Sequence, residues 1–212
     1  MILTNNVLCC VKQNTINNAT KEDLSKSKYY LISHLAREFL IKNNITKLPV
    51  PLNQIIKNNE WKFLKYLEAK KLNNTELNIL MEKNLGFCLE IKDKYIIFFN
   101  EDLPIEKIRF VIAHEIGHIV LRHFLHGNKT LNIEKEANMF ATRILMPIVI
   151  LKELNIQTPN ALQKFCNVEF KIANYRFNRL QLLKKRNKFF TDKNEIILYN
   201  QFKDFLENNK NS

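Results

Sequence analysis

The chain has 212 residues, of which 46% are hydrophobic and 25% are charged. This length and balance are typical of a globular protein with a real core, and they argue against a disordered or low-complexity chain. A formal net charge of +12 gives a basic surface, which attracts anions and nucleic acid without specificity.

The cysteines and the apolar segments indicate the cellular compartment. Two of the four cysteines are adjacent, Cys9 and Cys10, which does not suit a disulfide framework. No segment approaches the roughly 18 uninterrupted apolar residues of a membrane helix. The start of the chain, residues 1–5, lacks the cationic region and the apolar stretch of a signal peptide. We therefore expect a cytoplasmic protein with reduced thiols and no membrane attachment.

The first hundred residues are predicted to mix helices with short strands. In chain order the predicted elements are a polar, Asn-rich arm over 1–28, helices over 29–42 and 52–59, a strand over 61–66 and a hairpin of strands over 87–91 and 94–99. Residues 72–83 are ambiguous. The strand over 95–99 is also a candidate sheet edge, to which an extended peptide could add.

A His-Glu-x-x-His motif lies inside the next predicted helix, over 105–124. Residues four apart share one face of a helix, so His114 and His118 project the same way. Two neutral imidazoles at this spacing can bind one Zn²⁺. Glu115 follows the first histidine and is placed to act as a general base toward a water held on that metal. The motif therefore predicts a catalytic zinc site.

A second predicted helix, over 134–146, can supply the third protein ligand that zinc needs. Its small and apolar residues recur at helical spacing, and Pro147 marks its end. Glu134 lies on this buried stripe, so it is our choice for the third ligand, with Glu136 as the alternative. Asn138, one turn after Glu134, is placed to hydrogen-bond a ligand histidine from behind. A charged first turn favoured by the helix dipole would also explain one of the two glutamates.

These two segments together resemble the ImmA/IrrE family of zinc metallopeptidases. The matching motifs are His-Glu-Ile-Gly-His at 114–118 and the run Glu-x-x-Ala-Asn-x-Phe-Ala-x-x-Ile-Leu-Met-Pro over 134–147. Weaker similarities, in chain order, lie at 48–56, 86–87, 95–100, 109–110 and 162–183. The resemblance thus covers roughly residues 30–183. One departure is that the family often has a histidine four residues after the second ligand, where this chain has Arg122 followed by His123.

The resemblance implies a fold and an activity. With three glycines and five prolines, the composition also favours a helix-rich protein. We expect an α+β fold, with a helix-rich zincin-like core over 29–158, a small antiparallel or mixed sheet, and a basic helical segment over 159–212. The implied activity is that of a zinc endopeptidase, and the implied substrate is a helix–turn–helix transcriptional repressor of a mobile element, prophage or stress regulon.

The charge distribution leaves alternatives open. Residues 161–212 hold 11 Lys and Arg against 5 Asp and Glu. A weak nucleic-acid contact is possible through the densest basic cluster, Lys184, Lys185, Arg186 and Lys188. Residues 161–183 also have the length of a helix–turn–helix unit, although a plain helical pair covering the core fits equally well. Alternative functions are a DNA-binding regulator with a structural metal site, and a toxin-like interaction protein without proteolysis.

Overall fold

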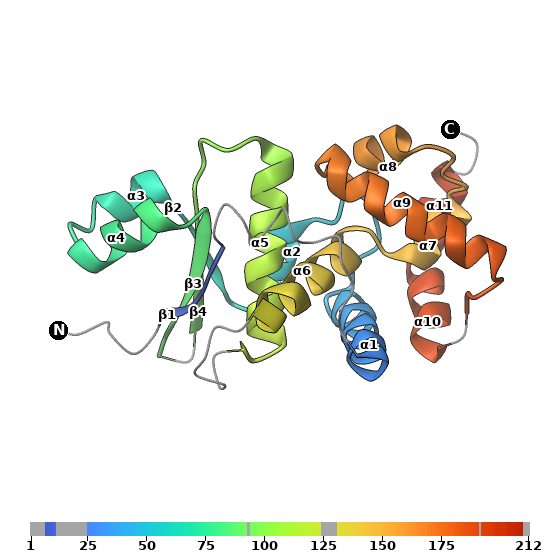
Figure 1. Ribbon diagram of the computed structural model, residues 1–212, viewed down its shortest axis with the longest axis horizontal. Helices are drawn as coiled ribbons and strands as arrows, with labels where there is room; N and C mark the ends of the chain where they lie inside the picture. Colours follow the sequence, from blue (N-terminus) through green and yellow to red (C-terminus); the bar gives the residue numbers. More distant parts are fainter. Residues whose placement is uncertain (1–6, 12–24, 93, 124–130, 191, 210–212) are drawn as a thin grey trace. The chain divides into compact units, whose positions relative to one another are not determined.

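The protein folds into a small mixed sheet and a series of helices, as the computed structural model of the chain shows (Figure 1). The structure describes residues 7–11, 25–92, 94–123, 131–190 and 192–209. The predicted α+β class is confirmed. Among the described residues, no helix is long and apolar enough to cross a membrane.

The chain divides into two compact units. The first holds the described residues before Ser25 together with Leu52–Ala141, and the second holds Ser25–Pro51 and Thr142–Asn209. These units do not follow the boundaries predicted at residues 28 and 158. Helix α1 (Lys26–Lys42) packs against α10 (Lys193–Gln201), and this long-range contact groups 25–51 with the C-terminal helices.

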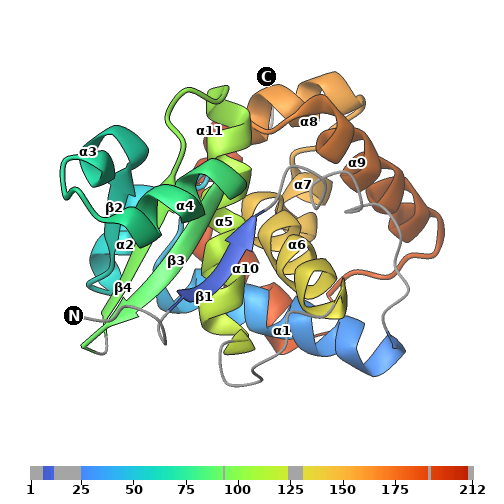
Figure 2. The ribbon, with the colours of Figure 1, turned by 60° about the vertical axis from the view of Figure 1, so that its left-hand side comes forward.

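The sheet of the first unit has four strands in the order β1-β3-β4-β2. These strands are β1 (Val7–Val11), β2 (Lys62–Lys65), β3 (Gly86–Ile91) and β4 (Lys94–Phe99). Strand β3 pairs antiparallel with β1 and β4, whereas β2 pairs parallel with β4 (Figure 2). The predicted hairpin is therefore present as β3–β4.

Two expectations about the strands are wrong. The arm predicted over 1–28 contains β1, whose pairing with β3 is a long-range contact that local composition does not reveal. The strand over 95–99 is not an edge, because β3 and β2 flank β4 on its two sides. The edges of the sheet are instead β1 and β2.

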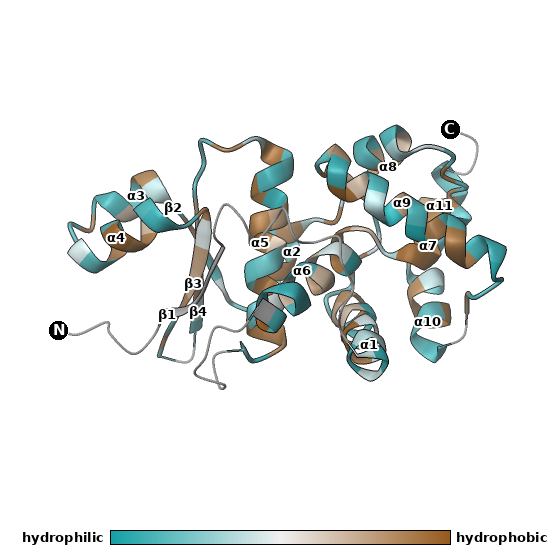
Figure 3. Cartoon of the chain, viewed as in Figure 1, coloured by the Kyte–Doolittle hydropathy of each residue, from teal (hydrophilic) through white to brown (hydrophobic). Residues whose placement is uncertain are grey.

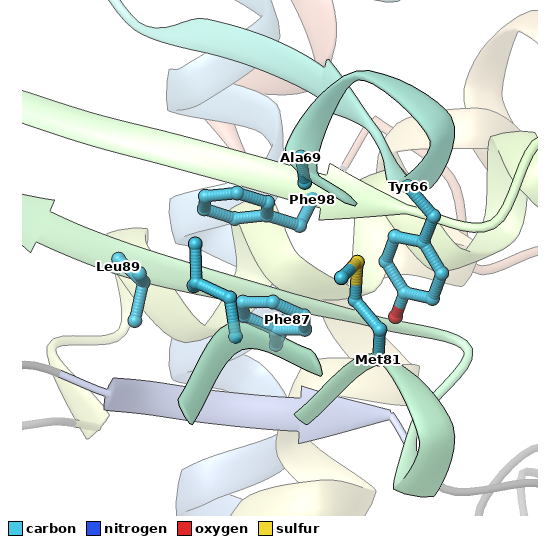
Figure 4. Close-up of a cluster of buried hydrophobic side chains, with 7 residues drawn as sticks. Tyr66, Ala69, Met81, Phe87, Leu89 and Phe98 are labelled. Carbon is cyan, nitrogen blue, oxygen red and sulfur yellow. The ribbon is translucent and has the colours of Figure 1, made fainter. Parts of the chain in front are cut away.

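Helices cover both faces of the sheet. Two short helices, α3 (Tyr66–Lys70) and α4 (Thr75–Lys83), bury their apolar side chains against Phe87 and Phe98, whose rings stack with centroids 4.6 Å apart (Figure 4). The ambiguous segment over 72–83 is thus largely helical. Successive residues of a strand point to opposite faces. Gly86, the neighbour of Phe87, accordingly faces Val111 of helix α5 (Ile105–Val120).

The second unit consists of helices. Besides α1 and α10 it contains α7 (Ile148–Glu153), α8 (Pro159–Cys166), α9 (Phe170–Lys185) and α11 (Lys203–Asn209). Hydrophobic and hydrophilic residues intermix along these helices, as expected where one side of a helix is buried (Figure 3). The remaining helices are α2 (Leu52–Asn58) in the first unit and α6 (Leu131–Leu145), which runs across the division at Ala141.

A cluster of polar side chains links α1 to α10 within the second unit. Asp192 caps α10 by accepting a hydrogen bond from the backbone N–H of Asn194 at 2.8 Å. The same carboxylate accepts one from Nη2 of Arg37 at 2.6 Å and lies 3.0 Å from Nδ1 of His34. Partial burial alone would raise the pKa of Asp192, but these hydrogen bonds and the charge of Arg37 outweigh it and hold that pKa well below its usual range.

We expect Asp192→Ala to lower the free energy of unfolding by about 1–2 kcal/mol at pH 7, since it removes both the helix cap and the ion pair with Arg37. Asp192→Asn should retain the cap through its one accepting oxygen, and it removes the charge and the second accepting oxygen, which faces Arg37. A carboxylate whose pKa is depressed in the folded state stabilises that state fully when the pH is above its unfolded-state pKa of about 3.9. This stabilisation is progressively lost as the pH falls below that value. The difference in the free energy of unfolding between wild type and Asp192→Asn, measured by urea unfolding, should therefore be smaller at pH 3 than at pH 7. Equal separation at both pH values would contradict this role.

Candidate metal centre

Helix α5 presents the His-Glu-x-x-His motif in a fully enclosed position. It begins after Pro104, and its last turn contains His118. His114 and Glu115 are 0% exposed and His118 is 1% exposed, so the motif belongs to the core of the first unit. Polar groups are buried at this depth only where they have partners or bind a metal.

Helix α6 approaches the motif closely because of a glycine. A Cβ built on Gly117 would lie 3.1 Å from both the Cα and the carbonyl oxygen of Ala137, and 3.4 Å from the Cβ of Phe140. Gly117 stands between the two histidines of the motif, and Ala137 stands between Glu134 and Asn138 on α6. The contact between these two small residues therefore brings the polar residues of both helices to the same place.

Three of the predicted residues converge. The Nε2 atoms of His114 and His118 are 2.8 Å apart. The carboxylate of Glu134 lies 3.3 Å from Nε2 of His114 and 3.7 Å from Nε2 of His118. One atom from each of these residues falls within 4.8 Å of the others, and together they form the one candidate metal cluster among the described residues.

The donor set suits zinc. Two neutral imidazoles and one carboxylate, with room for a further ligand, form a donor set found in catalytic zinc sites. Ligand atoms bonded at about 2.0–2.1 Å in a tetrahedron lie roughly 3.3 Å from one another. The observed separations of 2.8, 3.3 and 3.7 Å fall on both sides of that value.

The two candidate glutamates occupy different places. Glu134 faces the Nε2 atoms of both histidines, whereas the Oε2 atom of Glu136 lies 3.2 Å from Nε2 of His123. His123 follows the end of α5, and its Nδ1 atom lies 2.8 Å from Nδ1 of His118. Oδ1 of Asn138 lies 2.7 Å from Nδ1 of His114.

Sequence reasoning missed His123 as a site residue. The available signal was a histidine five residues after His118. Arg122 takes a left-handed backbone conformation with φ of 53°, directly before His123. Because this turn interrupts the helix, the position of His123 beside Nδ1 of His118 does not follow from helical spacing.

The electrostatics of the site favour a cation. Burial by itself lowers the pKa of His114, but the hydrogen bond and charge of Glu134, the charge of Glu115 and the contact with Asn138 together raise that pKa. The same negative charges that favour a proton on the imidazole also favour a divalent cation at its Nε2 atom.

The predicted basic cluster lies elsewhere. Lys184 and Lys185 end α9, Arg186 follows as its C-cap, and Lys188 comes two residues later, all in the second unit. Lys185, Arg186 and Lys188 are exposed.

An HExxH helix with a glutamate from the next helix is the kind of site found in metallopeptidases. A family model described as Peptidase_M78, IrrE N-terminal-like domain, matches residues 68–178, more than half of the chain. The chain belongs to this family, which indicates a metallopeptidase. No curated protein matches the chain.

The glycine contact can be tested directly. In a helix interior Ala is ordinarily about 1 kcal/mol more favourable than Gly. We nevertheless expect Gly117→Ala to lower the free energy of unfolding by about 1–3 kcal/mol, because the added methyl group meets the backbone of Ala137. Metal content, measured by elemental analysis, should fall in the same variant as α6 is displaced. A variant that is more stable than wild type and retains its metal would show that the close approach is unimportant.

Proposed function

We propose that the protein is a zinc-dependent endopeptidase. The observation that carries this proposal is the convergence of His114, His118 and Glu134 next to a buried Glu115. The two histidines and Glu134 would hold the ion. Zinc, when bound, polarises a peptide carbonyl and makes water a stronger nucleophile at neutral pH.

Glu115 is the general base in this proposal. It is adjacent to His114 on α5 and is not one of the three converging residues. Its carboxylate accepts the proton of the attacking water and then delivers that proton to the departing amine. Its burial keeps the carboxylate away from bulk solvent, where hydration would weaken its action.

An extended substrate would add to the sheet at β1. Strands β3 and β4 have partners on both sides, which leaves β1 and β2 for addition of a peptide strand. Helix α5 packs against β1, whereas α2 and α3 pack against β2. The β1 edge is therefore the edge associated with the helix that carries His114 and His118.

The proposed substrate is a helix–turn–helix transcriptional repressor of a mobile element, prophage or stress regulon. This substrate class is the one that the resemblance of residues 114–118 and 134–147 to the ImmA/IrrE family implies. An extended backbone is needed beside the metal, so cleavage would fall in a linker or in a helix that opens locally. The net charge of +12 would help to capture a repressor that sits on DNA, and this help weakens with added salt.

Co-expression with the repressor encoded beside this protein, followed by immunoblotting, tests the proposal. Wild type should cut the repressor under inducing conditions. Glu115→Gln should keep its metal and fold but abolish cleavage, because the general base is removed. Glu134→Gln should abolish both metal binding and cleavage.

A repressor that stays full-length with wild type, or is cut equally by Glu115→Gln, would overturn the peptidase proposal. A zinc-loaded protein that binds its partner without cutting it would instead favour an interaction protein.

A second function, direct contact with DNA, is favoured by helix α9. Helix α8 leads through a three-residue turn, with Asn167 in a left-handed conformation, into this 16-residue helix. Among the residues of α9 there are five Lys and Arg and no Asp or Glu. Lys171, Asn174 and Asn178 are exposed at positions i, i+3 and i+7, so they share one side of the helix. Lysine binds phosphate and asparagine can bind adenine edges.

We propose that this side of α9, with the basic cluster at 184–188, contacts nucleic acid. Fluorescence anisotropy with duplex DNA at increasing salt should show affinity that falls with salt. Lys185→Ala/Arg186→Ala should reduce the salt slope by about 1–2, because each phosphate that is no longer neutralised lowers the slope by about one unit. The control Lys70→Ala/Lys71→Ala also removes two exposed positive charges and should leave the slope unchanged. Equal effects of the two pairs would mean that the attraction is only net charge.

A further inference from the structure

We propose that His123 and Glu136 are positioning residues, which hold His118 in the orientation and tautomer needed to bind zinc. The inference rests on the proposed zinc site, because it assigns a role behind one of the three ligands. It also gives Glu136 a function different from that of a metal ligand. The evidence is a continuous chain of contacts from His118 through His123 to Glu136, with separations of 2.8 and 3.2 Å.

The two nitrogens of His118 have separate tasks. Its Nε2 atom faces Nε2 of His114 and the carboxylate of Glu134, so this nitrogen is the one available to a metal. Its Nδ1 atom points the other way and lies 2.8 Å from Nδ1 of His123. A ligand imidazole is oriented by the hydrogen bond that its other nitrogen makes.

The proton order along the chain follows from the chemistry of neutral imidazoles. A neutral imidazole that binds metal through Nε2 carries its proton on Nδ1. His118 therefore donates from Nδ1, and Nδ1 of His123 must accept. The proton of His123 then resides on Nε2, which donates to Oε2 of Glu136. Each link has one donor and one acceptor, and Glu136 remains an acceptor throughout.

Burial strengthens the hydrogen bonds that link His118, His123 and Glu136. His123 is 6% exposed and Glu136 is 7% exposed. Water has little access to compete for these hydrogen bonds, and a low local dielectric strengthens each of them. Buried carboxylates need hydrogen-bond partners, and His123 supplies one to Glu136.

The arrangement parallels the support of the other ligand histidine. Asn138 contacts Nδ1 of His114 directly, with Oδ1 at 2.7 Å. The support of His118 is one residue longer, because His123 is inserted between the ligand and Glu136 of α6. Both ligand histidines are thus oriented from α6, the helix that also supplies Glu134.

Zinc affinity, measured by competition with a chromophoric chelator, tests the proposal without reference to proteolysis. His123→Leu removes both links and should weaken zinc binding by about 10–100-fold. His123→Gln can still accept from His118 through its carbonyl and donate to Glu136 through its amide, so it should recover most of that affinity. Glu136→Gln should weaken binding less than Glu134→Gln, which removes a ligand outright.

Two controls and one spectroscopic measurement complete the test. Glu106→Gln on α5 and His34→Leu on α1 make the same chemical changes outside the chain of contacts, so both should retain wild-type affinity. Thermal unfolding of the metal-free variants will reveal any variant that no longer folds. In the zinc-loaded protein, ¹⁵N shifts should show His123 protonated at Nε2 and unprotonated at Nδ1.

Wild-type zinc affinity in His123→Leu, equal weakening in the Leu and Gln variants, or a His123 protonated at Nδ1 would each overturn this inference. The peptidase proposal fails by a different result, an uncut repressor with a zinc-loaded wild-type protein. Tight zinc binding that depends on His123, with no cleavage, would therefore support the positioning role and reject the proposed activity.

Discussion

The close contact between α5 and α6 at Gly117 and Ala137 is the constraint on which the metal centre depends. Two helices with ordinary side chains at their contact pack 8–10 Å apart. Here the Cα and carbonyl oxygen of Ala137 come within 3.1 Å of the place where a Cβ of Gly117 would be. At this approach the carboxylate of Glu134 lies 3.3 and 3.7 Å from the Nε2 atoms of His114 and His118. The glycine inside the HExxH motif is therefore explained by packing.

Helix α6 contributes three polar side chains to the centre, and their positions around the helix determine which histidine each one contacts. Glu134 and Asn138 are four residues apart, on one side of the helix, and both contact His114. Glu136 is rotated about 200° from Glu134 and reaches His123 instead. The two glutamates of one helical turn thus lie in different environments.

Much of this candidate site could be predicted from the sequence, because it depends on the spacing of residues within single helices. The i, i+4 spacing of His114 and His118 and the buried stripe that selects Glu134 over Glu136 follow from helical periodicity alone. His123 could not be found this way, because Arg122 adopts a left-handed turn that breaks the periodicity.

In the sheet, too, local sequence patterns reveal individual strands but not the long-range pairing between them. The hairpin β3–β4 is visible in alternation and turn residues, whereas the parallel pairing of β2 with β4 and the addition of β1 join residues far apart in the chain. Periodicity therefore identified β4 as a strand but could not place it inside the sheet. The grouping of residues 25–51 with the C-terminal helices depends likewise on contacts such as that of Arg37 with Asp192.

The burial of the centre implies that metal binding and folding are linked. Glu115, Glu136 and both ligand histidines are at most 7% exposed, so the folded chain concentrates carboxylates where hydration cannot compensate for their charge. A divalent cation offsets that cost in the folded state and has no preformed site in the unfolded chain. A metal ion at 100 times its dissociation constant would add about 2.7 kcal/mol to the free energy of unfolding. The hydrogen-bonded supports behind His114 and His118 act in the same direction, because imidazoles that are already oriented give up less entropy when they bind the ion.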